Sequence, residues 1–181
     1  MKKVIATTLC FFCLFGASLS ARAVDSVSFE VGGGDDANLA RVGVQWDWDK
    51  KWFEGGDWTL GGYWDLSLGY WSGDGGASGG DKNITDIGFT PVFRFRQNNT
   101  NGAAVYFEGA VGFHLLSDSR VHASKDLGSD FEFGDHIGAG VLFGDRQQYD
   151  FSYRFQHLSD AGISDKNLGV NFHQLRFPYH F

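Results

Sequence analysis

The chain has 181 residues, a formal net charge of −7, 17% aromatic residues and 26 glycines. An acidic chain is a poor nucleic-acid binder, so nucleic acid is not an expected partner. No stretch reaches the roughly 18 consecutive apolar residues of a transmembrane helix, so none is expected.

The first 23 residues have the layout of a secretory signal peptide. Lys2 and Lys3 make the N-terminus positive, and residues 4–15 form a short apolar run. Ala21-Arg22-Ala23 then provides small residues at the two positions that signal peptidase recognises. Cleavage after Ala23 is therefore expected, and it leaves one domain over residues 24–181.

Both cysteines, Cys10 and Cys13, lie in the removed segment. A lipoprotein anchor on one of them is the alternative, but neither is preceded by a convincing recognition box. The mature chain then has neither a disulfide nor a thiol nucleophile. Loss of three basic residues with the signal peptide changes the formal charge from −7 to −10.

Strand side chains point alternately to opposite faces, so a period of two in hydrophobicity predicts strands. Eight segments of the mature chain show this period, with apolar and aromatic residues on one face and polar residues or glycine on the other. They are Val27–Val31, Val42–Trp48, Leu60–Tyr70, Phe89–Phe95, Val105–Phe113, Phe133–Phe143, Phe151–Phe155 and Leu175–Phe181.

A soluble β-sandwich or a lipocalin-like barrel also alternates, but three features favour a transmembrane barrel. The strands have the length of a tilted membrane crossing, aromatics gather at strand ends, and the chain ends on an aromatic strand with Phe181. The polar face carries both charges, which must pair inside a small barrel: Glu30, Asp47, Asp65, Glu108, Glu132 and Asp150 with Arg41, Arg94, Arg96, Arg154 and Arg176. We therefore predict an all-β protein, an eight-stranded antiparallel transmembrane β-barrel in a bacterial outer membrane.

The connections divide into two sets that alternate along the chain. Residues 49–57, 97–102 and 144–148 are expected on the periplasmic side, and residues 32–38, 72–83, 117–130 and 160–169 on the outside. The glycine-rich stretch 72–81 predicts a mobile loop rather than a calcium site, because its acidic residues lack a regular ligand spacing.

His157 and Ser159 are the residues most able to do chemistry. They continue the outward parity of Phe155, and residues two apart on a strand share a face with about 7 Å between their bases. An imidazole at that distance can take the serine proton and activate the hydroxyl. The alternative is that the barrel wall stops at Phe155 and both residues simply lie among lipid headgroups.

The segment His157-Leu158-Ser159-Asp160-Ala161-Gly162, followed by Asn167, resembles the signature of the PagL family of outer-membrane lipid A 3-O-deacylases. The resemblance implies an eight-stranded barrel acting on lipid A, or lipopolysaccharide, in the outer leaflet. It implies Ser159 as nucleophile and His157 as general base. It also implies an oxyanion hole formed by the backbone of Asp160 and Gly162 with help from Asn167.

Two residues depart from the family pattern. Asp160 stands where the family has asparagine after the serine, and a carboxylate beside a developing oxyanion is unfavourable unless only its backbone is used. Asn171 stands fourteen residues after His157, at the position of the family's acidic third member. An asparagine still accepts a hydrogen bond from imidazole and fixes its tautomer, but Asp160 or Asp165 is an alternative third member.

These observations predict a serine esterase that removes the 3-linked acyl chain of lipid A. No cofactor is expected, and no His, Asp or Glu cluster has metal-ligand spacing. A non-enzymatic barrel, such as an adhesin or structural protein, and a barrel palmitoyltransferase are the alternatives. Oligomeric state stays open, a homodimer included. His173 and four loop residues are additional candidates for substrate contact: Lys82, Arg120, Lys125 and Lys166.

Overall fold

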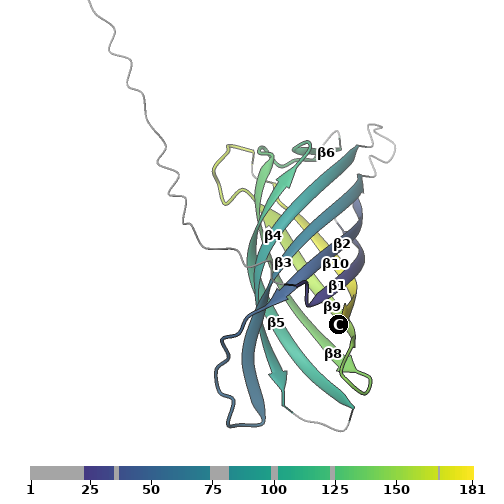
Figure 1. Cartoon of the computed structure of the whole chain (residues 1–181). Coiled ribbons are helices and arrows are strands. Elements are labelled where there is room, and N and C mark those ends of the chain that lie inside the picture. Colours follow the sequence, from purple (N-terminus) through teal and green to yellow (C-terminus); the bar gives the residue numbers. More distant parts are fainter. Residues whose placement is uncertain (1–22, 35–36, 74–81, 99–101, 123–124, 167) are drawn as a thin grey trace, which may run out of the picture.

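The computed structural model describes residues 23–34, 37–73, 82–98, 102–122, 125–166 and 168–181. Eight long antiparallel strands close into a barrel in the order β1-β10-β9-β8-β5-β4-β3-β2 (Figure 1). Their bounds are β1 Ser26–Gly34, β2 Ala37–Asp47, β3 Trp58–Gly73, β4 Asn83–Gln97, β5 Ala103–Leu116, β8 Phe131–Phe143, β9 Tyr149–Ser159 and β10 Val170–His180.

The predicted strands and barrel are therefore confirmed, and the structure corrects two connections. Strands β1 and β2 extend into the predicted 32–38 loop, leaving only residues 35–36 between them. The predicted loop 117–130 contains a separate two-stranded sheet, β6 (Arg120–His122) with β7 (Lys125–Asp126). The described residues include no helix long and apolar enough to cross a membrane. The predicted signal peptide, apart from Ala23, lies outside the described residues.

The outer wall of the barrel is apolar, as the alternation predicted. Large side chains on this wall remain exposed, for example Ile137 at 68% and Val111 at 58% of their full area. A monomeric soluble protein rarely exposes a continuous apolar surface of this kind. Every strand contributes to it, so the wall is suited to contact with lipid around its whole circumference.

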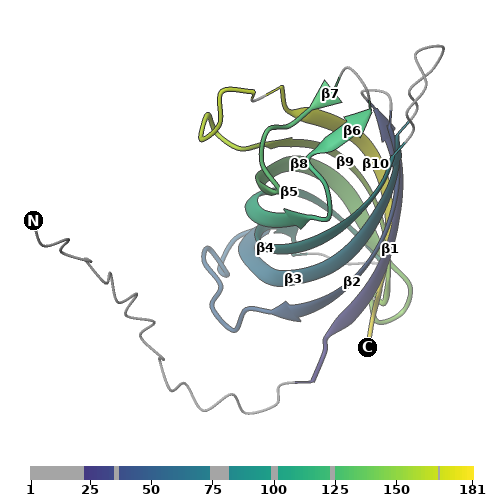
Figure 2. The same cartoon turned by 90° about the horizontal axis from the view of Figure 1, so that it is seen from above.

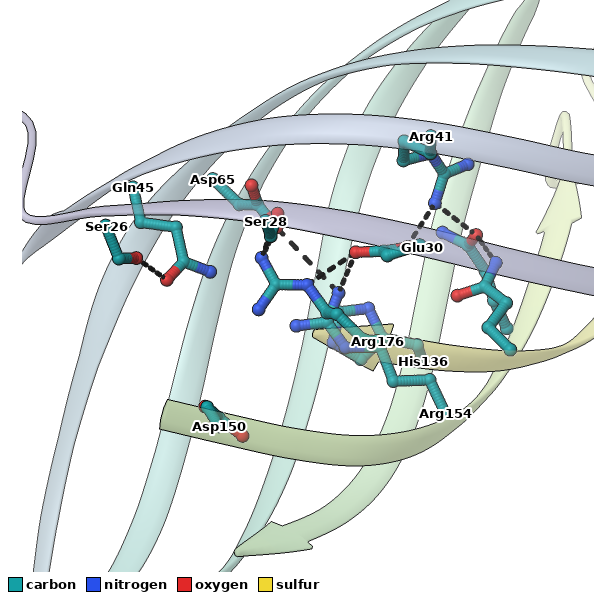
Figure 3. A network of polar contacts seen from close by, with 12 residues as sticks. Ser26, Ser28, Glu30, Arg41, Gln45, Asp65, His136, Asp150, Arg154 and Arg176 are labelled. Carbon is teal, nitrogen blue, oxygen red and sulfur yellow. Dashed lines mark hydrogen bonds and ion pairs between the residues drawn. The ribbon is translucent and has the colours of Figure 1, made fainter. Parts of the chain in front are cut away.

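The interior contains a connected set of ion pairs (Figure 3). Glu30 accepts from Arg176 Nε at 2.5 Å and Arg154 Nη1 at 3.1 Å, and its second oxygen lies 3.4 Å from Arg41. Arg154 also donates to Glu108 at 2.6 Å. Because interior arginines lie between buried carboxylates, the predicted pairing of interior charges is confirmed at these residues.

The interior becomes apolar at the loop end, which the alternation did not predict. Here the inward side chains form a buried cluster with two residues of the segment that carries β6 and β7, Val121 and Leu127. Figure 2 shows β6 and β7 at this end of the ring. The barrel members are Ala37, Leu39, Trp71, Ile84, Leu116, Leu158, Val170 and Phe172. This cluster closes the loop end and holds the end of β9 from inside.

Candidate active site at the loop end of strand β9

The candidate residues lie where β9 meets its two neighbours. His157 pairs with Asn171 of β10 on one side, and Ser159 pairs with Phe133 of β8 on the other. His157, Ser159 and Asn171 are all half-buried, whereas Leu158 between them is fully buried. The three polar side chains therefore share the outward face, which the sequence parity predicted.

A hydrogen bond joins His157 to Asn171. The Nδ1 of His157 lies 2.8 Å from Oδ1 of Asn171. An amide oxygen only accepts, so Nδ1 carries the proton and donates, and Nε2 is left as the basic nitrogen. This is the tautomer that a general base needs. The hairpin between β9 and β10 brings the two residues together, so Asn171, rather than Asp165 or Asp160, holds the His157 ring.

Ser159 is the last residue of β9 and is two residues from His157 on the same face. The part of the chain that the structure describes has no hydrogen bond between the Ser159 hydroxyl and the His157 ring. Such bonds are often long before substrate binds and tighten in the complex. Leu158 fixes the backbone between the pair, because it is fully buried in the apolar cluster and pairs with Val170.

Asp160 orders the turn that follows the serine. Its carboxylate accepts from the backbone N–H of Gly162 at 2.8 Å and of Ser164 at 2.7 Å. Hydrogen bonds from Ser164 and Gly162 lower the pKa of the Asp160 carboxyl. Both oxygens of the carboxylate are thus used within its own turn.

The three predicted oxyanion-hole residues differ in their placement. Asp160 follows the serine directly, and its side chain is fully buried. The Gly162 N–H already donates to Asp160, so an oxyanion would have to compete for it. Asn167 lies outside the described residues.

The sequence interpretation missed Asp135, which pairs with His157 from β8. The sequence does place Asp135 on the outward face, because it has the same parity as Phe133 and Ile137. Recognising it also required the register between β8 and β9, which alternation does not give.

The other proposed contacts with substrate have partners within the protein. Lys82 forms a close ion pair with Asp118. Arg120 and Lys166 both lie near Asp126, at 3.4 and 3.1 Å. His173 Nδ1 lies 2.5 Å from the Tyr153 hydroxyl on the outer wall. Contact of these basic residues with lipid A phosphates remains a prediction.

Gly169 supports the His157 ring from the end of the loop. It has φ of +58°, and a Cβ there would lie 2.8 Å from Cε1 of His157. We expect Gly169→Ala to displace the ring and reduce esterase activity by about tenfold or more, since small misplacements of a catalytic group are costly. Ester hydrolysis by the purified barrel measures the effect.

Gly102→Ala is the matched control for this prediction. Gly102 has φ of +93°, but a Cβ there meets nothing within 4 Å, and it lies at the opposite end of the barrel. Both variants carry the same kind of backbone strain, about 1–3 kcal/mol. Equal activity in the two variants would contradict a steric role for Gly169.

Comparison with known proteins identifies the family and the fold. Residues 38–180 match the family model of PagL, lipid A 3-O-deacylase. The chain is 36% identical to lipid A deacylase PagL of Pseudomonas aeruginosa, over 86% of each chain. It is 34% identical to lipid A deacylase PagL of Bordetella bronchiseptica, over 86% of this chain and 83% of that one.

A solved structure of the outer membrane enzyme PagL has the same fold. It superposes with a TM-score of 0.76 at 30% identity, covering 86% of this chain and 99% of that one. The family model spans the barrel from β2 to β10 and includes His157, Ser159 and Asn171. The chain belongs to the PagL family of lipid A 3-O-deacylases.

Proposed function

We propose that this protein hydrolyses the 3-linked acyl ester of lipid A, with Ser159 as nucleophile and His157 as general base. The observation that carries the proposal is the hydrogen bond of 2.8 Å from His157 to Asn171. His157 is two residues before Ser159 and lies on the same outward face. Family membership supplies the substrate class. Site residues of this chain supply the mechanism.

The chemistry follows from these positions. His157 Nε2 takes the Ser159 proton as Oγ attacks the ester carbonyl, and the tetrahedral oxyanion is stabilised by backbone N–H donors at the turn that begins with Asp160. The protonated His157 then gives its proton to the departing sugar hydroxyl. Water, deprotonated by His157, releases the acyl group from Ser159 and completes hydrolysis.

Asn171 orients the imidazole in this scheme. It keeps the proton on Nδ1 and so keeps Nε2 basic towards the serine. Cys-His-Asn sites show that an amide performs this task, although it stabilises the imidazolium less than a carboxylate does.

The position of the site fits a substrate in a membrane. We place the apolar wall in the outer membrane with the β9–β10 loop outside, which sets the site at the level of the outer leaflet. Lipid A in that leaflet meets an outward-facing serine without entering the barrel. This explains why the active-site side chains lie on the wall rather than in an interior pocket.

Mass spectrometry of lipid A from bacteria expressing the protein tests the proposal. Wild-type protein is expected to shift lipid A to lower mass by one hydrolysed acyl chain, whereas Ser159→Ala leaves the mass unchanged. Unchanged lipid A with wild-type protein would indicate a non-enzymatic barrel. A higher mass would indicate a palmitoyltransferase.

A further inference from the structure

The end of the barrel opposite to Ser159 contains a cavity of about 220 Å³ that the esterase mechanism does not use. Residues of the loop after β2, of β3 and β4, and of the turn between β8 and β9 line it. Figure 1 shows this loop and this turn together at the lower end of the barrel, away from β6. The cavity therefore lies at the end that the proposed orientation places in the periplasm.

Basic side chains from separate parts of the chain meet in this cavity. Arg94 and Arg96 come from β4, Lys51 from the loop after β2, and Arg146 from the turn between β8 and β9. Asp47 is the one acidic residue among those that line it. A concave surface with an excess of one sign concentrates ions of the opposite sign, because the low-dielectric walls focus the field.

Arg96 departs from the pairing of the other interior arginines. Arg94, two residues before it, lies 3.0 Å from Glu108 and 3.1 Å from Asp150. Half-buried Arg96 has no carboxylate within ion-pair distance in the part of the chain that the structure describes. The charge of Arg94 repels it, and that of Asp47 attracts it from further away. A partly buried charge without a partner is costly, so an anion from outside the chain would be favoured here.

Two exposed residues at the rim add further uncompensated charge. Lys51 and Arg146 have no ion-pair partner within the described ranges. Together with Arg96 they place three positive charges around Asp47, which leaves an excess of two. The turn that carries Arg146 is locally ordered, because its backbone N–H donates to the Gln148 side chain at 3.0 Å. The charge excess is therefore held at a defined place.

A buried donor in the same lining also lacks an acceptor. Trp48 lines the cavity, and its indole Nε1 is buried with no hydrogen-bond partner among the described residues. Buried polar groups in folded proteins are nearly always hydrogen-bonded, either within the protein or to water or a ligand. An anionic oxygen is a suitable acceptor for this N–H, so the hydrogen-bonding inventory agrees with the charge excess.

We propose that this cavity binds a phosphate group from the periplasmic side. Guanidinium groups bind phosphate oxygens in bidentate geometry, and a lysine adds a point charge. A phosphate group carries up to two negative charges near neutral pH, which matches the excess of two. At about 30 Å³ for each water molecule, the cavity accommodates a phosphate group and a few waters but not a whole phospholipid. The ligand is therefore free phosphate or the headgroup phosphate of an inner-leaflet lipid.

Phosphate binding by the purified barrel in a phosphorus-free, uncharged detergent tests the proposal. Phosphorus NMR linewidths follow the binding of inorganic phosphate and, separately, of glycerophosphoglycerol, a lipid headgroup without acyl chains. We expect saturable binding of one or both, with Kd on the order of 1 mM, that chloride at matched ionic strength does not reproduce. Arg96→Gln should weaken binding by about tenfold or more, because it removes the bidentate donor.

Lys51→Gln and Lys50→Gln provide a matched pair of controls. Each removes one positive charge from an exposed position of the same loop, but only Lys51 lines the cavity. Lys51→Gln should weaken phosphate binding by about threefold or more, whereas Lys50→Gln should leave it unchanged. Arg96→Gln leaves no carboxylate without a partner, so it should fold as the wild type does. Heat-modifiable migration on gels checks the folding of every variant.

Each outcome decides between possible ligands or overturns the site. Binding of inorganic phosphate alone would assign the cavity to free phosphate, and binding of glycerophosphoglycerol would assign it to a lipid headgroup. No saturable binding of either compound would overturn the proposal, as would equal binding by the wild type and Arg96→Gln. Equal weakening by Lys51→Gln and Lys50→Gln would also overturn it, because general surface charge would then explain the binding.

Discussion

Ser159→Ala is expected to reduce lipid A deacylation by on the order of 10⁴-fold or more, because no other group replaces the attacking oxygen. His157→Ala should cause a similar loss, since the Ser159 hydroxyl then has no base to accept its proton. Release of fatty acid from lipid A in detergent micelles measures both effects, and the residual rate reports the contribution of substrate binding and the oxyanion donors.

The two substitutions should not be additive. When two residues act in the same catalytic step, removal of either one already removes nearly the whole rate enhancement. The double variant is therefore expected to be about as inactive as each single one. A rate for Ser159→Ala within tenfold of the wild type would contradict the mechanism. So would a double variant far slower than both single variants, because that result means independent contributions.

Neither substitution should unfold the barrel. Both side chains are half-buried on the outward face, and neither belongs to the interior ion-pair network. The strand between them is held by Leu158, which is fully buried in the apolar cluster at the loop end. Heat-modifiable migration should therefore match the wild type, which separates loss of chemistry from loss of structure.

Alternation alone located the outward face of the active site. Because side chains on a strand have a period of two, the sequence placed His157 and Ser159 together, and the parity of β10 added Asn171. Asn171 itself was indicated by the resemblance to the PagL family, whose third member falls fourteen residues after the histidine, and Asp160 and Asp165 stayed open as alternatives. The register between β9 and β10, which the structure supplies, decides among them by pairing Asn171 with His157.

Asp135 required information that alternation does not carry. Parity says which face a residue occupies, but not which residue on the next strand stands opposite it. The pairing of Asp135 with His157 depends on the register that the turn 144–148 imposes between β8 and β9. A shift of register by two residues would keep every side chain on its face and still move Asp135 away from His157.

The loop and the apolar cluster were unpredictable for different reasons. The use of the Asp160 carboxylate by Gly162 and Ser164 depends on backbone dihedrals of an irregular turn, including φ of +55° at Ala161. The apolar cluster depends on height along the barrel, because Trp71 and Phe172 share inward parity with charged residues further down the same strands. Alternation with a period of two tells which face a side chain occupies. It does not tell at which height in the barrel the inward side chains change from charged to apolar.

Arg154→Met is expected to cause the largest loss of stability, about 3–5 kcal/mol of unfolding free energy. Arg154 is 3% exposed and donates to Glu108 at 2.6 Å, to Glu30 at 3.1 Å and to the Tyr63 hydroxyl at 2.6 Å. Methionine fills similar space but leaves the two carboxylates with less compensating charge in the barrel interior. Urea unfolding of the barrel in detergent, followed by tryptophan fluorescence, measures the loss.

The ion pair of Lys166 with Asp126 provides the matched comparison, because its 3.1 Å separation is similar but Lys166 is 67% exposed. Lys166→Met should cost less than about 1 kcal/mol, since water screens a surface pair. Adding Glu108→Gln to Arg154→Met removes the charge of one carboxylate that lost a partner and should restore part of the stability. Similar losses for Arg154→Met and Lys166→Met, or no recovery with Glu108→Gln, would mean that interior charge balance does not determine the stability of this barrel.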